Sequence, residues 1–272
     1  MPELPEVETT RRGIAPHIEG HTVTDVIVRE PRLRWPVPPA LKAALRGQRL
    51  RRVARRSKYL LLHFDHGTLL LHLGMSGSLR VLPAGTPPQA HDHLDIVFDD
   101  DQCVRLRDPR RFGSVHWTRG DPADHPLLAA LGPEPLGEDF TGDYLYARSR
   151  RRKSAVKVFL MDSKVVAGVG NIYANEALFR AGVHPGRAAG RISRERYARI
   201  AAAVREVLTA AIAAGGTTLR DFTLADGSPG YFRLSLAIYD RTGQPCLRCG
   251  QAIRESRLGQ RSTFHCPHCQ RS

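Results

Sequence analysis

The chain has 272 residues, of which 42% are hydrophobic, so it is long enough for about two domains and too apolar for a disordered protein. It carries 41 Lys and Arg residues against 27 Asp and Glu residues, a formal net charge of +14. This excess favours a polyanionic partner, of which nucleic acid is the commonest. The sequence has no apolar stretch of transmembrane length and no basic amphipathic helix with an aromatic face, which argues against a membrane partner.

The first residues, Met1-Pro2-Glu3-Leu4-Pro5-Glu6, are acidic and proline-rich and do not form a signal peptide, so we expect a cytoplasmic protein. Removal of the initiator Met would leave Pro2 with a free secondary amine. Because an α-amine has a reference pKa of about 8, against about 10.4 for Lys, more of it is neutral and able to attack an electrophilic carbon. Glu3 would donate or accept protons beside this amine. The alternative is that these residues form a solvated, extended leader.

The first half of the sequence predicts a short helix followed by β-strands. Residues 7–14 favour a helix, in which Glu and Thr give way to Arg. Asp65-His66-Gly67 is a hairpin signal between two apolar runs. Several short strands with frequent turns predict a sandwich or flattened barrel. We expect the strands at residues 23–28, 59–64, 68–73, 94–98, 102–106 and 113–118.

This half also contains candidates for contacts with nucleic acid. The basic run 51–59 includes Lys58, the last cation before an apolar strand, although the run is also typical of a solvated edge strand. Phe112 lies in the loop Asp108-Pro109-Arg110-Arg111-Phe112-Gly113, where it would wedge between base pairs while Arg110 fills the place of an extruded base. Met75, in His72-Leu73-Gly74-Met75-Ser76-Gly77, is either a second wedge or a core residue.

Residues 119–142 are rich in Asp, Pro and Gly, which is typical of a linker, and the sequence beyond them is helical. Ser193 predicts the N-cap of a long helix that ends at Gly215-Gly216. Ile192 and Tyr197 are placed to form a hydrophobic staple at its start.

An earlier helix is expected to start near Asn171 and to stop before Gly182. The stretch Gly168-Val169-Gly170-Asn171 would leave backbone N–H groups free for a phosphate oxygen, although Asn is also a routine helix cap. A second basic run, 148–153, predicts phosphate contacts or solvated charges.

Four of the five cysteines form two close pairs, Cys246 with Cys249 and Cys266 with Cys269, separated by sixteen residues. This spacing falls within the range of a four-thiolate zinc site, with a spacer long enough for a β-hairpin. Disulfides would need an oxidising compartment, which nothing in the sequence supports. Because four thiolates leave no open coordination position, one structural Zn²⁺ is expected. Cys103 stands alone in a predicted strand, as a core residue would.

Together, these motifs resemble those of the bacterial formamidopyrimidine-DNA glycosylases, the 8-oxoguanine DNA glycosylase/AP lyases. The resemblance covers essentially the whole chain. It rests on segments in a fixed order: Pro2-Glu3-Leu4-Pro5-Glu6, Lys58-Tyr59-Leu60-Leu61, His72-Leu73-Gly74-Met75-Ser76-Gly77, Asp108-Pro109-Arg110-Arg111-Phe112-Gly113, Gly168-Val169-Gly170-Asn171-Ile172-Tyr173 and the four cysteines.

The resemblance implies roles for individual residues. Pro2 would attack C1′ of the damaged nucleotide and form a Schiff base, and Glu3 would handle protons during base loss and sugar opening. Lys58 would act in β-elimination and phosphate binding, and Arg261 in δ-elimination. The stretch 217–239 would close over the extruded base. Further DNA contacts, some of them filling the space left by that base, are implied for Met75, His91, Arg110, Phe112, Arg152, Asn171 and Arg261.

The expected fold class is α+β, with an N-terminal β-sandwich and flanking helix, a helix-two-turn-helix domain and a four-Cys zinc-finger β-hairpin. We expect the catalytic sandwich at residues 2–118, the linker at 119–142, the helical domain with the lesion-recognition loop at 143–236 and the zinc finger at 237–272. The implied partner is double-stranded DNA that contains oxidised purines or abasic sites. The chain would act as a monomer, associated with the nucleoid in the bacterial cytoplasm.

Two rival functions stay open. The endonuclease VIII-like enzymes of the same superfamily prefer oxidised pyrimidines, but they usually have Gly where this chain has Leu4, and here the Arg110-Arg111-Phe112 wedge is kept. A non-enzymatic protein that only binds lesions would need none of Pro2, Glu3, Lys58 and Arg261.

Overall fold

The computed structural model describes residues 2–215 and 236–271, and we refer only to these below. By their contacts, residues 2–129 form one compact unit, and residues 130–214 with 236–271 form another.

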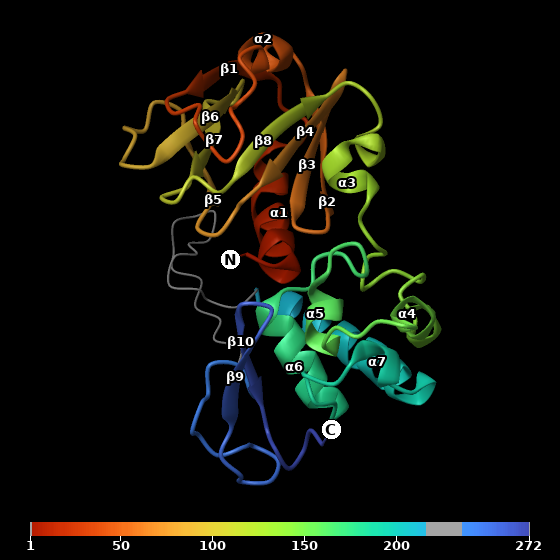
Figure 1. Cartoon of the computed structure of the whole chain (residues 1–272). Helices are drawn as coiled ribbons and strands as arrows, with labels where there is room; N and C mark the ends of the chain where they lie inside the picture. The colour runs from red at the N-terminus through yellow and green to blue at the C-terminus, as the bar shows by residue number, and fades with distance from the viewer. Residues whose placement is uncertain (1, 216–235, 272) are drawn as a thin grey trace. The chain divides into compact units, whose positions relative to one another are not determined.

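The first unit contains two four-stranded antiparallel sheets (Figure 1). One sheet has the order β1-β6-β7-β5 and the other the order β2-β3-β4-β8. Apolar side chains from both sheets form one continuous buried core. The strands are β1 (Val23–Val28), β2 (Leu50–Arg56), β3 (Tyr59–Phe64), β4 (Gly67–His72), β5 (Ser78–Pro83), β6 (Asp92–Phe98), β7 (Gln102–Arg107) and β8 (Ser114–Thr118).

Helix α1 (Leu4–Ile18) packs against β2, β3 and β5, so it lies beside an edge strand of each sheet. It begins with a capping box, in which the Glu3 and Glu6 side chains each accept a hydrogen bond from the other's backbone N–H. The helix extends beyond the predicted residues 7–14 at both ends, and this cap fixes its start. The unit also contains α2 (Leu41–Leu45), a 3-10 turn η1 (Pro122–Asp124) and α3 (Pro126–Ala129).

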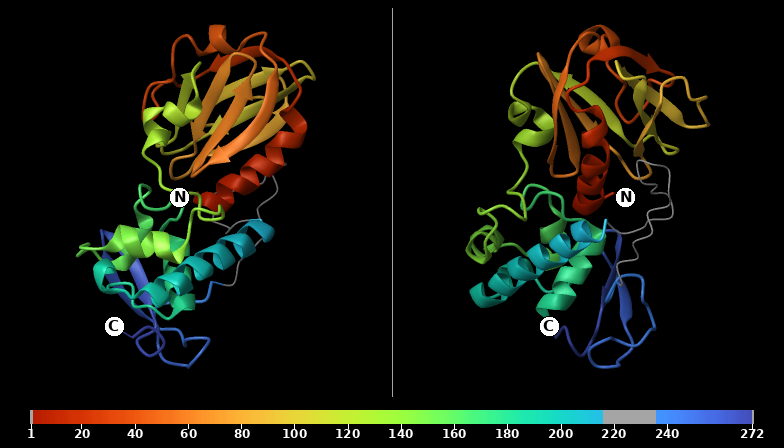
Figure 2. Two further views of the ribbon diagram at one scale, coloured as in Figure 1. Left: turned by 90° about the vertical axis from the view of Figure 1, so that its right-hand side faces the viewer. Right: turned by 180° about the vertical axis from the view of Figure 1, so that it is seen from behind.

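The second unit is helical apart from one hairpin (Figure 2). Helix α7 packs against α4 and α6. The predicted N-cap is confirmed, because the Ser193 side chain accepts a hydrogen bond from the Arg196 N–H, and Ile192 and Tyr197 are fully buried. The helical elements are α4 (Gly142–Ser149), α5 (Val156–Met161), α6 (Asn171–Ala181), η2 (Ala189–Arg191) and α7 (Arg194–Ala213).

The hairpin consists of β9 (Arg254–Leu258) and β10 (Arg261–His265), and it lies in the spacer between the two cysteine pairs. Its side chains are largely exposed, apart from Thr263 and Phe264. Phe264 joins Phe179 of α6 and two of the cysteines in a small apolar cluster. The predicted fold class is therefore confirmed: β-sheets come first, then helices, then a four-Cys hairpin module.

Several elements were not anticipated from the sequence, namely β5 and the short helices α2 to α5. They are short, and their periodicity is correspondingly weak. Cys103 is buried in β7, as expected.

Candidate functional site

Pro2 and Glu3 directly precede α1 and both are buried, Glu3 with 3% of its surface exposed. The Glu3 N–H donates to Glu6 Oε2 at 2.8 Å, which fixes the backbone at the start of the chain. The N-terminal end of a helix carries partial positive charge, which disfavours a protonated amine beside it. Burial and the helix end would both favour a neutral amine at Pro2 if Met1 were removed.

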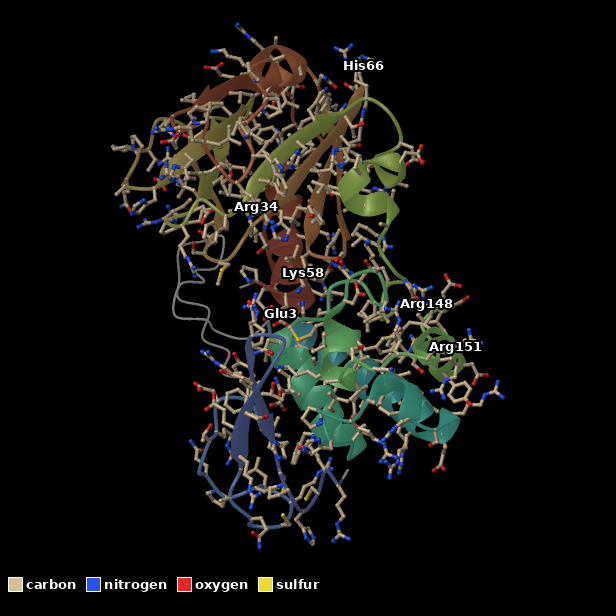
Figure 3. All side chains as sticks on the ribbon, viewed as in Figure 1. Glu3, Arg34, Lys58, His66, Arg148 and Arg151 are labelled. Atoms are coloured by element: carbon tan, nitrogen blue, oxygen red, sulfur yellow. The ribbon has the colours of Figure 1, made fainter. Side chains whose placement is uncertain are left out.

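Lys58 lies in the two-residue turn between β2 and β3, next to Ser57, whose φ is +56°. Arg55 supports this turn, since its Nη1 donates to Ser57 O at 2.8 Å. The same guanidinium reaches Glu8 of α1, with Nε 3.3 Å from Oε2. A largely buried ion pair thus connects the helix that follows Glu3 to the turn that carries Lys58. Figure 3 labels Glu3 and Lys58 near the start of α1.

Glu8 also binds Arg11 and Arg12, with its Oε1 2.8 Å from a guanidinium nitrogen of each. Burial alone would raise the pKa of Glu8, but the hydrogen bonds from Arg11 and Arg12 and the charge of Arg55 outweigh it, and the pKa lies below its usual value. The carboxylate is therefore ionised at neutral pH and pairs with all three cations.

His72, at the end of β4, is neutral and accepts a hydrogen bond. Burial lowers its pKa to about 4, helped by the nearby charges of Lys58 and Arg34. Its Nδ1 accepts the Gly74 N–H at 3.0 Å, so the ring proton is on Nε2. The sequence motif contains His72, but its role was not anticipated.

Met75, Arg110 and Phe112 lie on two loops of this unit, between β4 and β5 and between β7 and β8. Phe112 is 43% exposed, and the Arg110 guanidinium lies 4.9 Å from its ring centre. A recess of 680 Å³ adjoins this pair, and Figure 3 labels one of its cations, Arg34. Arginines dominate its lining, which consists of Arg32, Leu33, Arg34, Arg110, Arg111 and Phe112.

His91 is exposed and has a φ of +73°, at the end of the loop between β5 and β6. The fully buried Arg105 supports this loop, since it donates to the backbone oxygens of Thr86 at 2.8 Å and Pro87 at 3.2 Å. Two further bonds of 2.8 Å join Arg105 to the Asp95 carboxylate, so the buried charge is neutralised.

In the second unit, Asn171 is the first residue of α6, and Gly170 rather than Asn171 is the N-cap. The Asn171 side chain instead donates to Ser262 O at 3.1 Å, next to Arg261. The structure therefore brings together two of the predicted phosphate-binding residues. Arg152 is exposed near the end of α4, and its backbone accepts the Gly190 N–H at 2.9 Å.

Arg261 directly follows the two-residue turn of the β9–β10 hairpin. Gly259 and Gln260 form this turn with φ values of +57° and +60°, as a type I′ turn requires. Lys157 of α5 is fully buried, and its Nζ donates at 2.7 Å to both Ser262 O and Thr263 Oγ1. Sequence reasoning missed Lys157, because its acceptors lie more than 100 residues away.

The four cysteines meet as a metal site requires, with their Sγ atoms all within 4.8 Å of one another. The Cys246–Cys269 and Cys249–Cys266 sulfurs are 3.9 and 3.4 Å apart. A tetrahedron with Zn–S bonds of about 2.3 Å would separate its sulfurs by about 3.8 Å. Backbone N–H groups of Arg248 and Cys269 point at sulfurs from 3.4 Å, so the residues present fit one structural Zn²⁺.

The predicted site residues thus fall into two groups, one on each unit. Most of the predicted recognition stretch 217–239 lies outside the described residues. None of the helices among the residues described is long and apolar enough to span a membrane.

Three consecutive segments of the chain match models of known protein families. Residues 1–115 match the family model described as the formamidopyrimidine-DNA glycosylase N-terminal domain, and residues 131–223 match its H2TH domain. Residues 243–271 match the zinc finger found in FPG and IleRS.

Two relatives are similar over their whole length and over all of this chain. The formamidopyrimidine-DNA glycosylases of Methylococcus capsulatus and Syntrophotalea carbinolica are 63% and 62% identical to it. Among solved structures, the MutM (FPG) protein of Thermus thermophilus is 38% identical with a TM-score of 0.88, covering 99% of this chain and 98% of its own. The Lactococcus lactis Fpg in complex with abasic-site DNA is 32% identical with a TM-score of 0.92, covering all of both chains.

Proposed function

The chain belongs to the formamidopyrimidine-DNA glycosylase family, and from that membership we propose that it excises oxidised purines from double-stranded DNA and then cleaves the strand. Its substrates would be 8-oxoguanine and formamidopyrimidines. The Lactococcus lactis Fpg was solved in complex with an abasic-site DNA, and a mutant of the same protein with a Fapy-dG-containing DNA, which supports this substrate class.

In the proposed reaction, the neutral Pro2 amine attacks C1′ of an extruded nucleotide, and the bond from C1′ to the base nitrogen breaks. The base leaves with its electron pair and a proton, and Glu3 is the group positioned to move protons beside C1′. The nitrogen, now bonded to C1′, loses its proton, and the C1′–O4′ bond of the sugar ring breaks as O4′ takes up a proton. The nitrogen lone pair then forms an iminium with C1′, which acidifies the 2′ proton. Loss of that proton expels the 3′ phosphate by β-elimination, and a second elimination expels the 5′ phosphate.

We assign the elimination of the phosphates to two cationic residues. Lys58 would act in the first elimination and Arg261 in the second, with Asn171 and Arg152 on the DNA backbone. Met75, Arg110 and Phe112 would fill the gap left by the extruded base, which offsets the cost of unstacking it. Zinc supplies no chemistry to these steps; its four thiolates hold the hairpin that presents Arg261.

The observation that carries the proposal is the buried start of the chain. Pro2 and Glu3 lie in a fixed conformation set by the Glu3–Glu6 cap, and α1 is tied by Glu8 to the turn with Lys58. A solvated leader would need neither the burial nor the cap.

Borohydride trapping on a duplex with 8-oxoguanine opposite cytosine tests this proposal. A covalent protein–DNA adduct is expected, with mass analysis placing it on a chain that begins at Pro2. Pro2→Gly keeps an amine and should retain some trapping, whereas one extra residue before Pro2 should abolish it. Undiminished lyase activity with a blocked N-terminus would exclude Pro2 as the nucleophile.

The same assay separates the rival functions. A clear preference for thymine glycol over 8-oxoguanine would identify an endonuclease VIII-like enzyme. Tight lesion binding without any adduct would identify a lesion-binding protein without catalysis. We also propose that the chain acts as a monomer in the bacterial cytoplasm.

A further inference from the structure

Three loops of the β-sandwich converge on one buried residue, Asp108, which has no exposed surface. It lies just after β7, where the chain leaves one sheet for β8 of the other. The loop between β4 and β5 also crosses between the sheets, and the loop between β5 and β6 ends at His91. These three loops carry Met75, His91, Arg110 and Phe112.

The Asp108 carboxylate joins the two loops that cross between the sheets. Its Oδ1 accepts the Ser76 hydroxyl at 2.8 Å, and its Oδ2 accepts the Gly113 N–H at 2.8 Å. The Ser76 hydroxyl oxygen in turn accepts the Arg110 N–H at 3.2 Å. A directed chain of bonds therefore runs from Arg110 through Ser76, the neighbour of Met75, to Asp108. Bonds to a buried carboxylate are stronger than bonds between neutral groups.

The backbone of Asp108 holds the third loop. Its N–H donates to His91 O at 3.1 Å, and its carbonyl lies 2.8 Å from the buried His93 Nε2. The same carbonyl accepts the Arg111 N–H at 3.1 Å. One backbone bond from Asp108 thus holds His91, and the His93 ring holds the same segment to the loop of Arg110 and Phe112.

The loops also touch without side chains between them. Gly74 has a φ of +64°, and a Cβ at this position would lie 2.4 Å from both Gly113 N and Phe112 C. Backbone packed this closely leaves no room for one loop to shift past the other. The close backbone contact and the hydrogen bonds to Asp108 therefore both hold the two loops in a fixed position relative to each other.

We infer that Asp108 is a positioning residue that couples Met75, Arg110, Phe112 and His91 into one rigid wedge, which enters the DNA as a unit. This inference rests on the proposed function. A rigid wedge lowers the entropy lost when the gap in the duplex is filled. Its loss should therefore slow base extrusion far more than elimination at a sugar that has no base to extrude.

Ser76→Ala is the first test, because it removes the bridge between the two crossing loops and leaves the buried carboxylate bonded to Gly113. Single-turnover cleavage of an 8-oxoguanine·cytosine duplex should fall about tenfold, the scale of one lost charge-assisted hydrogen bond. Cleavage of a preformed abasic site should fall by less than about threefold. Ser76→Thr keeps the hydroxyl and should restore the wild-type rate on both substrates. A 2-aminopurine beside the lesion should report slower wedge insertion only for Ser76→Ala.

Asp108→Asn separates geometry from charge. Its oxygen can face Gly113 N–H while its amide donates to Ser76 Oγ, so the coupling survives and both rates should stay within about threefold of wild type. Asp108→Ala loses every side-chain bond and should exceed the effect of Ser76→Ala on the 8-oxoguanine duplex. If Asp108→Ala does not fold, the two Ser76 variants decide alone.

The outcomes are distinct from failure of the proposed function. Wild-type protein that forms no borohydride adduct with abasic DNA overturns the proposed function whatever Ser76 does. If the wild type does form the adduct, equal rate losses on both substrates, or no loss for Ser76→Ala, overturn the coupling. So does a Ser76→Thr variant that behaves like Ser76→Ala.

Discussion

The molecule presents two candidate catalytic cations at hairpin turns, but it supports the two hairpins in different ways. Lys58 lies in the turn between β2 and β3, whose strands carry fully buried side chains such as Leu60 and Leu62. Arg261 follows the turn between β9 and β10, whose strands bury little beyond Thr263 and Phe264. The first hairpin is part of a sandwich core, whereas the second depends on four cysteines and a few polar bonds.

The difference shows where each cation obtains its precise position. Hydrophobic burial over a whole sheet fixes the turn of Lys58, with the Glu8–Arg55 pair as a local adjustment. A module of about thirty residues buries too little surface for that, so metal binding has to supply its folding free energy. The two hairpins should therefore lose their structure under different conditions: the first when the sandwich core unfolds, the second when the metal is removed.

The largest expected effect is the loss of zinc. A structural zinc contributes about 10–16 kcal/mol of apparent binding free energy at pH 7. Cys266→Ser, or a strong chelator, should unfold the finger, weaken DNA binding by at least about 100-fold and abolish the elimination assigned to Arg261. Both tryptophans, Trp35 and Trp117, lie in the first unit, so the unfolding midpoint measured by their fluorescence should not change.

Cys103→Ala is the matched control, because Cys103 lies in β7, outside the zinc cluster. It should keep one zinc per chain. A tryptophan midpoint that falls together with the zinc content would show that the two hairpins are not independent.

The next effect concerns the polar support of the finger. Lys157→Met removes the donor to Ser262 O and Thr263 Oγ1. Asn171 still donates to Ser262 O, so the main loss is at the buried Thr263 Oγ1, at a cost of about 2 kcal/mol. Zinc should leave faster on addition of a chelator, and the ratio of δ- to β-elimination product should fall about tenfold. Lys164→Met, at an exposed lysine of the same unit, should change neither quantity. An unchanged product ratio for Lys157→Met would mean that the metal alone positions Arg261.

The two hairpins also differ in how well the sequence predicts what supports them. The cysteine spacing alone predicts the zinc site and its hairpin, because all its ligands lie within 24 residues of one another. The cap at Ser193 was predictable for the same reason, as its partners lie on one helical turn. Local chemistry of this kind can be read directly from residue order.

Buried polar groups were not predictable, because their partners are remote. Arg105 alternates with the apolar Val104 and Leu106, a pattern typical of a solvent-facing position. It is nevertheless fully buried, because the Asp95 carboxylate and the backbone at Thr86 bind its guanidinium. For the basic run 51–59, the prediction of a solvated edge strand is confirmed in part. Strand β2 is an edge strand, and Arg51 and Arg52 are exposed. Arg55, in the same run, faces inward to Glu8.

The third prediction concerns acid. His72 lies beside the turn of Lys58, and burial lowers its pKa to about 4, so the unfolded chain binds a proton there at a higher pH than the folded one. The contribution of His72 to the free energy of unfolding is therefore fully present above pH 6.5 and is lost as the pH falls toward 4. Between pH 7 and pH 5 the loss is about 2 kcal/mol. His72→Gln should flatten the pH dependence of tryptophan-monitored urea unfolding by that amount. His66→Gln, at an exposed position, should not; equal slopes for wild type and His72→Gln would contradict the prediction.

The smallest effect is expected where the sandwich hairpin meets α1. Glu8→Gln keeps the shape of the side chain but loses the charge that three arginines face, and it should cost about 1 kcal/mol at pH 7. Because the folded-state pKa of Glu8 lies below its usual 4.5, this stability is present above pH 4.5 and is lost as the pH falls through the folded-state value. The gap between wild type and Glu8→Gln should therefore close in acid, whereas Asp124→Asn, at an exposed carboxylate of the same unit, should open no gap at any pH. Because the sheet core still fixes the turn, cleavage at an abasic site should change by less than about threefold; a loss as large as that from zinc removal would mean that Lys58, too, depends on local polar contacts rather than on the core.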